Sequence, residues 1–192
     1  VASSPVRALI GQNSKWVIEV DSGASGNVKF YPNWGTAIVT AANVITAAKW
    51  HHVACSWDTS LNLASIYVDG KLAAQGEDLT TDTTGAGNIY VGRKPDGGAS
   101  QEFDGHMDEI RLWEDLRTES ELRTDMFQGG TLANSGALFA RWSLDEGTGT
   151  TSDNAEGTSG NDLTVVAGGW AAGGTFTEGT STLSMTGDGT IT

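Results

Sequence analysis

Apolar and polar residues alternate in short runs along most of the chain, which is typical of half-buried β-strands. From Trp50 to Asp58, the apolar residues Val53, Cys55 and Trp57 occupy every second position. A second alternating run ends at Asp69-Gly70, a pair suited to the positive φ angles of a tight hairpin. The pattern predicts strands near 15–21, 27–32, 37–45, 50–58, 64–69, 71–75, 88–93, 104–113, 137–144, 162–167 and 181–191.

One helix interrupts this series and is predicted over 119–126. Thr118 is its expected N-cap, Glu121 completes a Thr-x-x-Glu capping box, and two glycines follow at 129 and 130. The turn-rich runs 147–160 and 168–174 are predicted to be loops within one domain. A chain of 192 residues is an ordinary length for a single β-sandwich.

Four phrases follow one another in a recognisable order: Trp50-His51-His52-Val53-Ala54, Tyr67-Val68-Asp69-Gly70, Val91-Gly92 and Phe103 to Trp113. Together they resemble the laminin-G-like and pentraxin-like domains of the concanavalin-A-like lectin/glucanase superfamily. The resemblance covers about residues 8–167 and implies an all-β jelly-roll sandwich with one short helix. Because this superfamily contains lectins, hydrolases, adhesion modules and structural domains, the resemblance does not fix the function.

The order of the phrases is unusual for the resembled family. Residues 137–192 resemble the part with which such a domain usually opens, whereas Arg7-Ala8-Leu9-Ile10 resembles a strand from its middle. We therefore interpret residues 1–192 as one laminin-G-like domain with a circularly permuted order. Two alternatives stay open: a fragment of a tandem array, or a chain whose residues 175–192 complete a neighbouring copy by strand exchange.

The charge balance narrows the class of partner. The chain has 24 acidic and 11 basic residues, a net charge of −13, which disfavours binding to nucleic-acid phosphates. It contains no apolar run long enough to span a bilayer, and its single cysteine, Cys55, excludes a disulfide within the chain. Because the sequence begins at Val1, a processed N-terminus is expected, and we predict a secreted protein, extracellular or on a particle surface such as a virion.

Two groups of oxygen-bearing side chains are candidate Ca²⁺ ligands, since this ion prefers carboxylate and carbonyl oxygens. The resemblance to pentraxin-like domains implies ligands in the loop after strand 88–93, where Asp96 and Glu102 stand. The second group lies in a Gly-rich stretch that can bend around an ion. Its predicted ligands are Asp145, Asp153, Asn161 and Asp162, and Glu146 and Asn154 belong to the same cluster. The alternative for both groups is a solvated loop in which Asp and Asn form turns without metal.

A catalytic site is not predicted. Glucanases of this fold use paired carboxylates on one strand, and Asp104, His106 and Asp108 would share one face of strand 104–113. In those glucanases the carboxylates follow the pattern Glu-x-Asp-x-(x)-Glu, and the first glutamate of this pattern is absent here. Glu109 and Arg111 are more simply interpreted as a surface ion pair.

The turn Tyr31-Pro32-Asn33-Trp34-Gly35 is the candidate sugar site. Lectins use an aromatic platform for the apolar face of a pyranose and amides for its hydroxyls, so Tyr31, Asn33 and an exposed Trp34 are the predicted ligand-binding residues. The phase of their neighbours predicts that three other tryptophans belong to the core: Trp16, Trp57 and Trp142.

The favoured function is a non-catalytic, surface-exposed module that binds a glycan or a protein, with or without calcium. The alternative is a structural component of an assembly, either a virion decoration or fibre protein or a filament subunit that self-assembles through its terminal strands.

Overall fold

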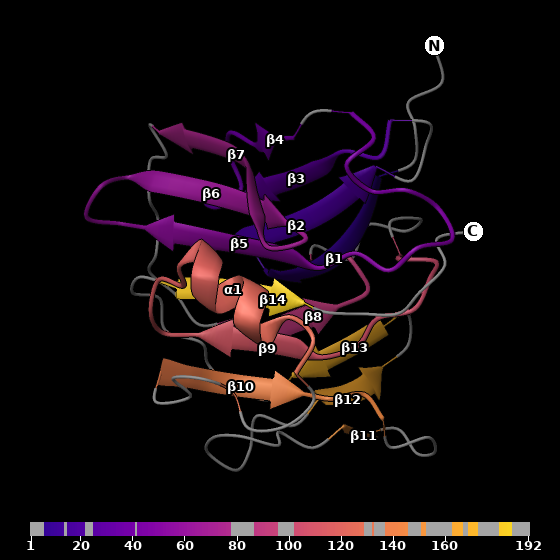
Figure 1. The fold of residues 1–192 in the computed structure, drawn as a ribbon. Coiled ribbons are helices and arrows are strands. Elements are labelled where there is room, and N and C mark those ends of the chain that lie inside the picture. Colours follow the sequence, from indigo (N-terminus) through magenta and orange to yellow (C-terminus); the bar gives the residue numbers. More distant parts are fainter. Residues whose placement is uncertain are drawn as a thin grey trace.

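Two β-sheets packed face to face make up the fold of the computed structural model (Figure 1). The structure describes residues 6–13, 15–21, 25–40, 42–77, 87–95, 102–128, 132 and 137–145, and the backbone of 151–152, 163–166, 169–172 and 181–185. All strand pairs are antiparallel. The all-β sandwich predicted from the sequence is therefore confirmed.

The strands follow an order that differs from their order along the chain. The eight-stranded sheet contains, from edge to edge, β11 (Thr151–Ser152), β12 (Leu163–Val166), β13 (Gly169–Ala172), β8 (Ile89–Val91), β1 (Val6–Gln12), β2 (Trp16–Asp21), β3 (Val28–Tyr31) and β4 (Ile38–Val39). The six-stranded sheet contains β10 (Leu138–Trp142), β9 (Ile110–Trp113), β14 (Ser181–Met185), β5 (Val53–Asp58), β6 (Leu63–Val68) and β7 (Lys71–Glu77).

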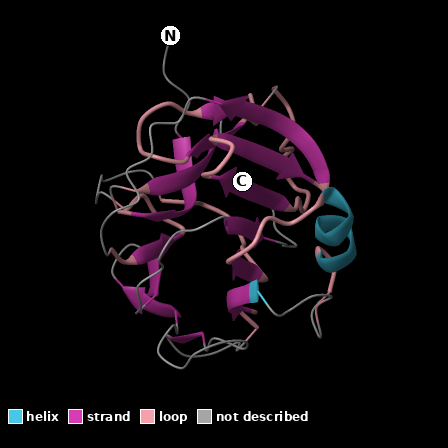
Figure 2. Ribbon diagram, turned by 90° about the vertical axis from the view of Figure 1, so that its left-hand side faces the viewer, coloured by secondary structure: helices cyan, strands magenta, loops and turns pink. Residues whose placement is uncertain are grey.

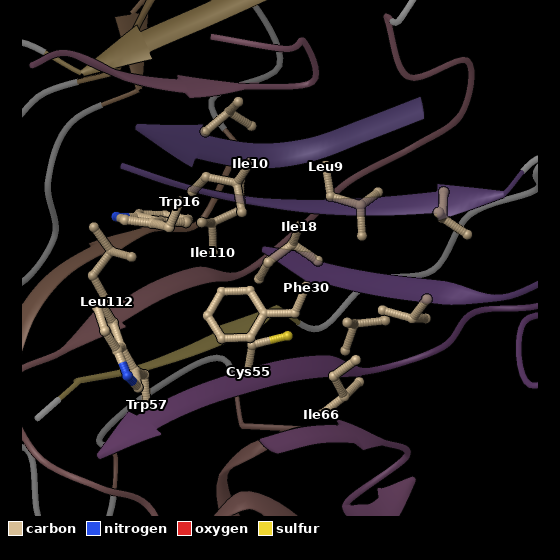
Figure 3. Packing of buried hydrophobic residues seen from close by; sticks show 14 of the residues in the cluster. Leu9, Ile10, Trp16, Ile18, Phe30, Cys55, Trp57, Ile66, Ile110 and Leu112 are labelled. Atoms are coloured by element: carbon tan, nitrogen blue, oxygen red, sulfur yellow. The ribbon is translucent and has the colours of Figure 1, made fainter. Parts of the chain in front are cut away.

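The core fills the space between the sheets (Figure 3). Ile10, Ile18 and Phe30 of the eight-stranded sheet pack in one buried cluster with Cys55 and Ile66 of the six-stranded sheet. Burial raises the pKa of the Cys55 thiol well above its usual value, which keeps it in the neutral form. The three tryptophans predicted to lie in the core are all buried there: Trp16, Trp57 and Trp142.

The last described strand, β14, occupies an interior position of the six-stranded sheet. It pairs with β5 on one side and β9 on the other, so that Leu183 stands opposite both Cys55 and Leu112. The strand-exchange hypothesis required residues 175–192 to pair with a neighbouring copy. The described part of that segment, Ser181–Met185, pairs within its own chain instead. Residues 175–180 and 186–192 lie outside the described part of the chain.

Some predicted elements are wrong. Among the described residues of the strand predicted over 37–45, only Ile38–Val39 is a strand; Asn43 has a φ of +63°, which ends any extended run. Of the strand predicted over 104–113, only Ile110–Trp113 is one. The runs predicted to be loops contain β11 and β13, and β13 forms because β8 and β12 supply its backbone partners.

The helix and the hairpin turn are confirmed. Helix α1 (Glu119–Asp125) begins at Thr118, whose Oγ1 accepts from the N–H of Glu121, while the Glu121 carboxylate accepts from the N–H of Thr118. The helix lies outside the sandwich, over the six-stranded sheet (Figures 1 and 2). Asp69 and Gly70 both have positive φ, as the hairpin requires. Within the described residues, no helix has the length and apolar character needed to cross a membrane.

Candidate functional site

The outward face of the eight-stranded sheet carries a row of side chains that runs across four strands. Tyr90 on β8 stands opposite Gly11 on β1, Gly11 opposite Val17 on β2, and Val17 opposite Tyr31 on β3. Their neighbours along each strand, such as Ile10 and Ile18, point into the core, so this row faces away from it. The row therefore has a tyrosine at each end and its smallest residue near the middle.

The segment that follows β8 folds back over this row. A Cβ atom added to Gly11 would lie 2.9 Å from Cγ of Pro95, so glycine makes room for the segment. The N–H of Gly92 donates to the carbonyl of Leu9, and the carbonyl of Gly92 accepts from the N–H of Phe103 at 2.8 Å. These bonds place Gly92 and Phe103 together beside Leu9 at the end of β8.

Two cations of this segment lie over aromatic rings. The Lys94 ammonium nitrogen is 5.4 Å from the centre of the Trp34 ring, and the Arg93 guanidinium carbon is 5.5 Å from the centre of the Tyr90 ring. Both distances are within the range of cation–π attraction. All four residues, together with Tyr31, are half-buried. We call these five residues the Trp34 face: Tyr31, Trp34, Tyr90, Arg93 and Lys94.

The turn after β3 determines where the Trp34 ring lies. Trp34 has a φ of +64°, in the left-handed region that non-glycine residues seldom occupy. The amide oxygen of Asn33 accepts from the N–H of Gly35 at 2.9 Å, which closes the turn around Trp34. Asn33, predicted as a ligand-binding residue, thus shapes the turn. Trp34, predicted to be exposed, is half-buried, and the Lys94 ammonium lies over its ring.

Tyr31 remains a neutral hydroxyl donor in this environment. Partial burial and the negative charge of Glu19 raise the pKa of the Tyr31 phenol above its usual value. Glu19 lies on β2, opposite Lys29 of β3, and is almost fully buried. A phenol beside a buried carboxylate can donate to, or accept from, a ligand hydroxyl.

The described residues do not assemble a metal site. Glu102 and Asp145 are both exposed, and no group of three or more His, Cys, Asp or Glu residues in the described part of the chain could hold an ion. Asp145 accepts from the Ser143 hydroxyl at 2.6 Å. Burial, and then the negative charges of Glu109 and Asp145, raise the pKa of Asp108 above its usual value. The other four predicted ligands lie outside the described residues: Asp96, Asp153, Asn161 and Asp162. Calcium binding therefore stays a prediction.

The carboxylates considered for catalysis do not form a strand face. Residues 104–109 are irregular, and Glu109 has a φ of +51°. The Glu109 carboxylate accepts from Arg111 at 2.8 Å and from two nitrogens of Arg141 at 2.8 and 2.7 Å. Arg111 has no exposed surface, so the predicted surface ion pair is in fact a buried network.

Asp69, His51 and Thr46 are linked in the way that the acid, base and hydroxyl nucleophile of a hydrolase triad are linked. His51 Nδ1 lies 2.9 Å from the Asp69 carboxylate, and His51 Nε2 lies 2.9 Å from the Thr46 hydroxyl. However, the backbone N–H of Thr46 also donates to Nε2, at 3.1 Å. A general base must take up a proton at that nitrogen, and the N–H donor opposes it. The arrangement instead ties the segment before β5 to the β6–β7 turn.

The fold is an all-β sandwich of two antiparallel sheets, and the Trp34 face adds an aromatic and cationic surface on the outer side of one sheet. The chain belongs to the concanavalin A-like lectin/glucanases superfamily, whose laminin-G-like family model matches residues 1–123. The resemblance inferred from the sequence phrases is therefore confirmed.

Two individual proteins are similar to the chain. The neuronal pentraxin receptor of Mus musculus is 33% identical over 82 residues, which cover 39% of this chain and 17% of the receptor. A crystal structure from Bacteroides ovatus, described as that of a candidate carbohydrate-binding protein, superposes with a TM-score of 0.61 at 21% identity and covers 88% of this chain and 47% of that protein. This chain thus spans less than half the length of each, and the second likeness concerns the fold.

Proposed function

We propose that the chain is a non-catalytic carbohydrate-recognition module that binds saccharides on the Trp34 face. The observation that carries the proposal is the meeting of two loops, one after β3 and one after β8. It places an indole and two cations beside the phenols of Tyr31 and Tyr90, which lie on those strands. An indole offers a flat apolar surface for a pyranose ring, and the polar groups around it suit the sugar hydroxyls. A carbohydrate ligand is also supported by the superfamily, which includes lectins, and by the description of the Bacteroides ovatus protein as carbohydrate-binding.

A location outside the cell is part of the proposal, because glycans and surface proteins are the partners that such modules meet there. A protein ligand is the second form of the hypothesis, supported by the partial match to the pentraxin receptor. A glycan array and a panel of surface proteins, probed with the same preparation, separate the two forms. Binding to proteins alone would contradict the glycan form.

Replacing Trp34 by alanine is expected to weaken glycan binding about tenfold or more, which is the range of a central aromatic contact. The fold should survive, because Trp34 already occupies a positive φ and alanine carries the same backbone cost there. Isothermal titration with the best glycan of the array measures the change in Kd.

Two further variants make this test specific. Trp34→Phe keeps a flat ring and should retain part of the affinity. Phe127→Ala removes an aromatic side chain that is 81% exposed but lies beyond helix α1, so it should leave the affinity unchanged. Equal affinities of wild type and Trp34→Ala would contradict the proposed site.

The calcium hypothesis is tested in the same titrations. If Ca²⁺ assists binding, the affinity falls in EDTA and returns when CaCl₂ is added in excess. An affinity that is the same in EDTA and in CaCl₂ contradicts the hypothesis.

A further inference from the structure

On the Trp34 face, Lys94 covers the platform that a sugar would use. Its ammonium nitrogen lies over the Trp34 ring, 5.4 Å from the centre, and the ring is itself half-buried. A pyranose can stack on this side of the indole only after Lys94 has moved. The cation–π contact with Trp34 that Lys94 gives up is by itself worth roughly a two- to fivefold change in affinity.

A neutral saccharide gains little in return for that displacement. An anionic saccharide gains more, because the displaced ammonium group can form a charge-assisted hydrogen bond with a carboxylate or sulfate on the sugar. Arg93, the preceding residue, adds a second positive charge beside the same surface. The rest of the chain repels anions, since its net charge is −13 with only 11 basic residues.

We propose that Lys94 is a specificity-determining residue: it shields Trp34 from neutral sugars and selects saccharides that carry an anionic group next to the stacked ring. This inference rests on the proposed function and names its ligand class. The negative charge of Glu19 beside Tyr31 disfavours an anion at that end of the face. The anionic group therefore lies on the Lys94 side of the stacked ring.

The test compares wild type with Lys94→Ala on an array of oligosaccharides that are matched in stereochemistry and are neutral, carboxylated or sulfated. Alanine is preferred to methionine, whose thioether could take the place of the ammonium group over the ring. Loss of Lys94 is expected to strengthen neutral binding roughly two- to fivefold, because the ring is uncovered. The same change is expected to weaken anionic binding about tenfold, because the charged hydrogen bond is lost.

Two control variants separate the role of Lys94 from that of positive charge in general. Lys94→Arg keeps a cation and should keep the preference for anionic sugars. Lys71→Ala removes an equal charge from an exposed position on β7 of the other sheet, outside the Trp34 face, so it should leave both anionic and neutral binding unchanged. Carboxylated and sulfated arms show which anion is preferred.

Each outcome decides between the two proposals. Neutral glycan binding that is lost in Trp34→Ala, without any anionic preference in wild type and without opposite shifts in Lys94→Ala, overturns the role of Lys94 but keeps the proposed function. No glycan binding at all overturns both. Opposite shifts for neutral and anionic sugars in Lys94→Ala support both.

Discussion

Replacing Glu109 by glutamine is expected to lower the free energy of unfolding by about 3–5 kcal/mol, the range seen when one partner of a buried ion pair is removed. The Glu109 carboxylate is the common acceptor for Arg111 and Arg141, and both guanidinium groups are buried. Glutamine keeps the shape of the side chain but removes the negative charge that both buried guanidinium groups share. Urea denaturation followed by tryptophan fluorescence measures the change.

Glu119→Gln is the matched control for this substitution. Glu119 forms an exposed ion pair with Arg123, at 3.3 Å, and its carboxylate also accepts from the N–H of Leu72, a bond that an amide oxygen can keep. The expected change is within about 0.5 kcal/mol, because exposed pairs contribute little. Similar losses in the two variants would contradict the special importance of the Glu109 network.

The Glu109 network also illustrates what the sequence could not reveal. In Asp108-Glu109-Ile110-Arg111, alternation places Glu109 and Arg111 on one face, and a strand face away from the core is normally a solvated one. Here that face is covered: Arg111 donates to the carbonyls of Asp125 and Gln128 at the end of helix α1. Only the tertiary position of the helix over the six-stranded sheet converts a surface pair into a buried one.

The parts of the fold that depend on local chemistry were predictable. The alternation around Cys55, the capping box at Thr118 and the turn at Asp69-Gly70 each satisfy a rule that acts within a few residues. Strand β13 obeys no such rule, because its Gly-rich sequence acquires strand geometry from its partners β8 and β12. The turn at Asn43 likewise depends on a bond to the carbonyl of Ser25, on a different turn.

The two loops that form the Trp34 face could be predicted from the sequence, but the contact between them could not. The turn sequence around Trp34 indicates an aromatic residue at the surface, and the segment from Lys94 onward indicates a second loop. Their contact joins residues that are far apart in the sequence and depends on the register of four strands. Tyr90 and Arg93 were missed, although Tyr90 stands between Ile89 and Val91 and so must face away from the core.

Acid is expected to destabilise the protein through His52. Burial, and then the positive charge of Arg111, lower the pKa of His52 from 6.5 to about 4, although the Asp69 carboxylate acts in the opposite direction. Between these two values the unfolded chain binds a proton at His52 that the folded chain does not. Unfolding therefore becomes more favourable as the pH falls through this range, by about 3 kcal/mol in total.

The contribution of His52 is isolated by comparing wild type with His52→Gln in urea denaturation at about pH 7 and about pH 4. Glutamine does not titrate, so the variant should lose about 3 kcal/mol less stability than wild type over this interval. The acidic residues contribute equally to both proteins and cancel in the difference. His106→Gln, at an exposed position, is the control and should follow wild type. Parallel pH profiles for wild type and His52→Gln would mean that the folded chain accepts a proton at His52 without cost, which is incompatible with a buried imidazole beside Arg111.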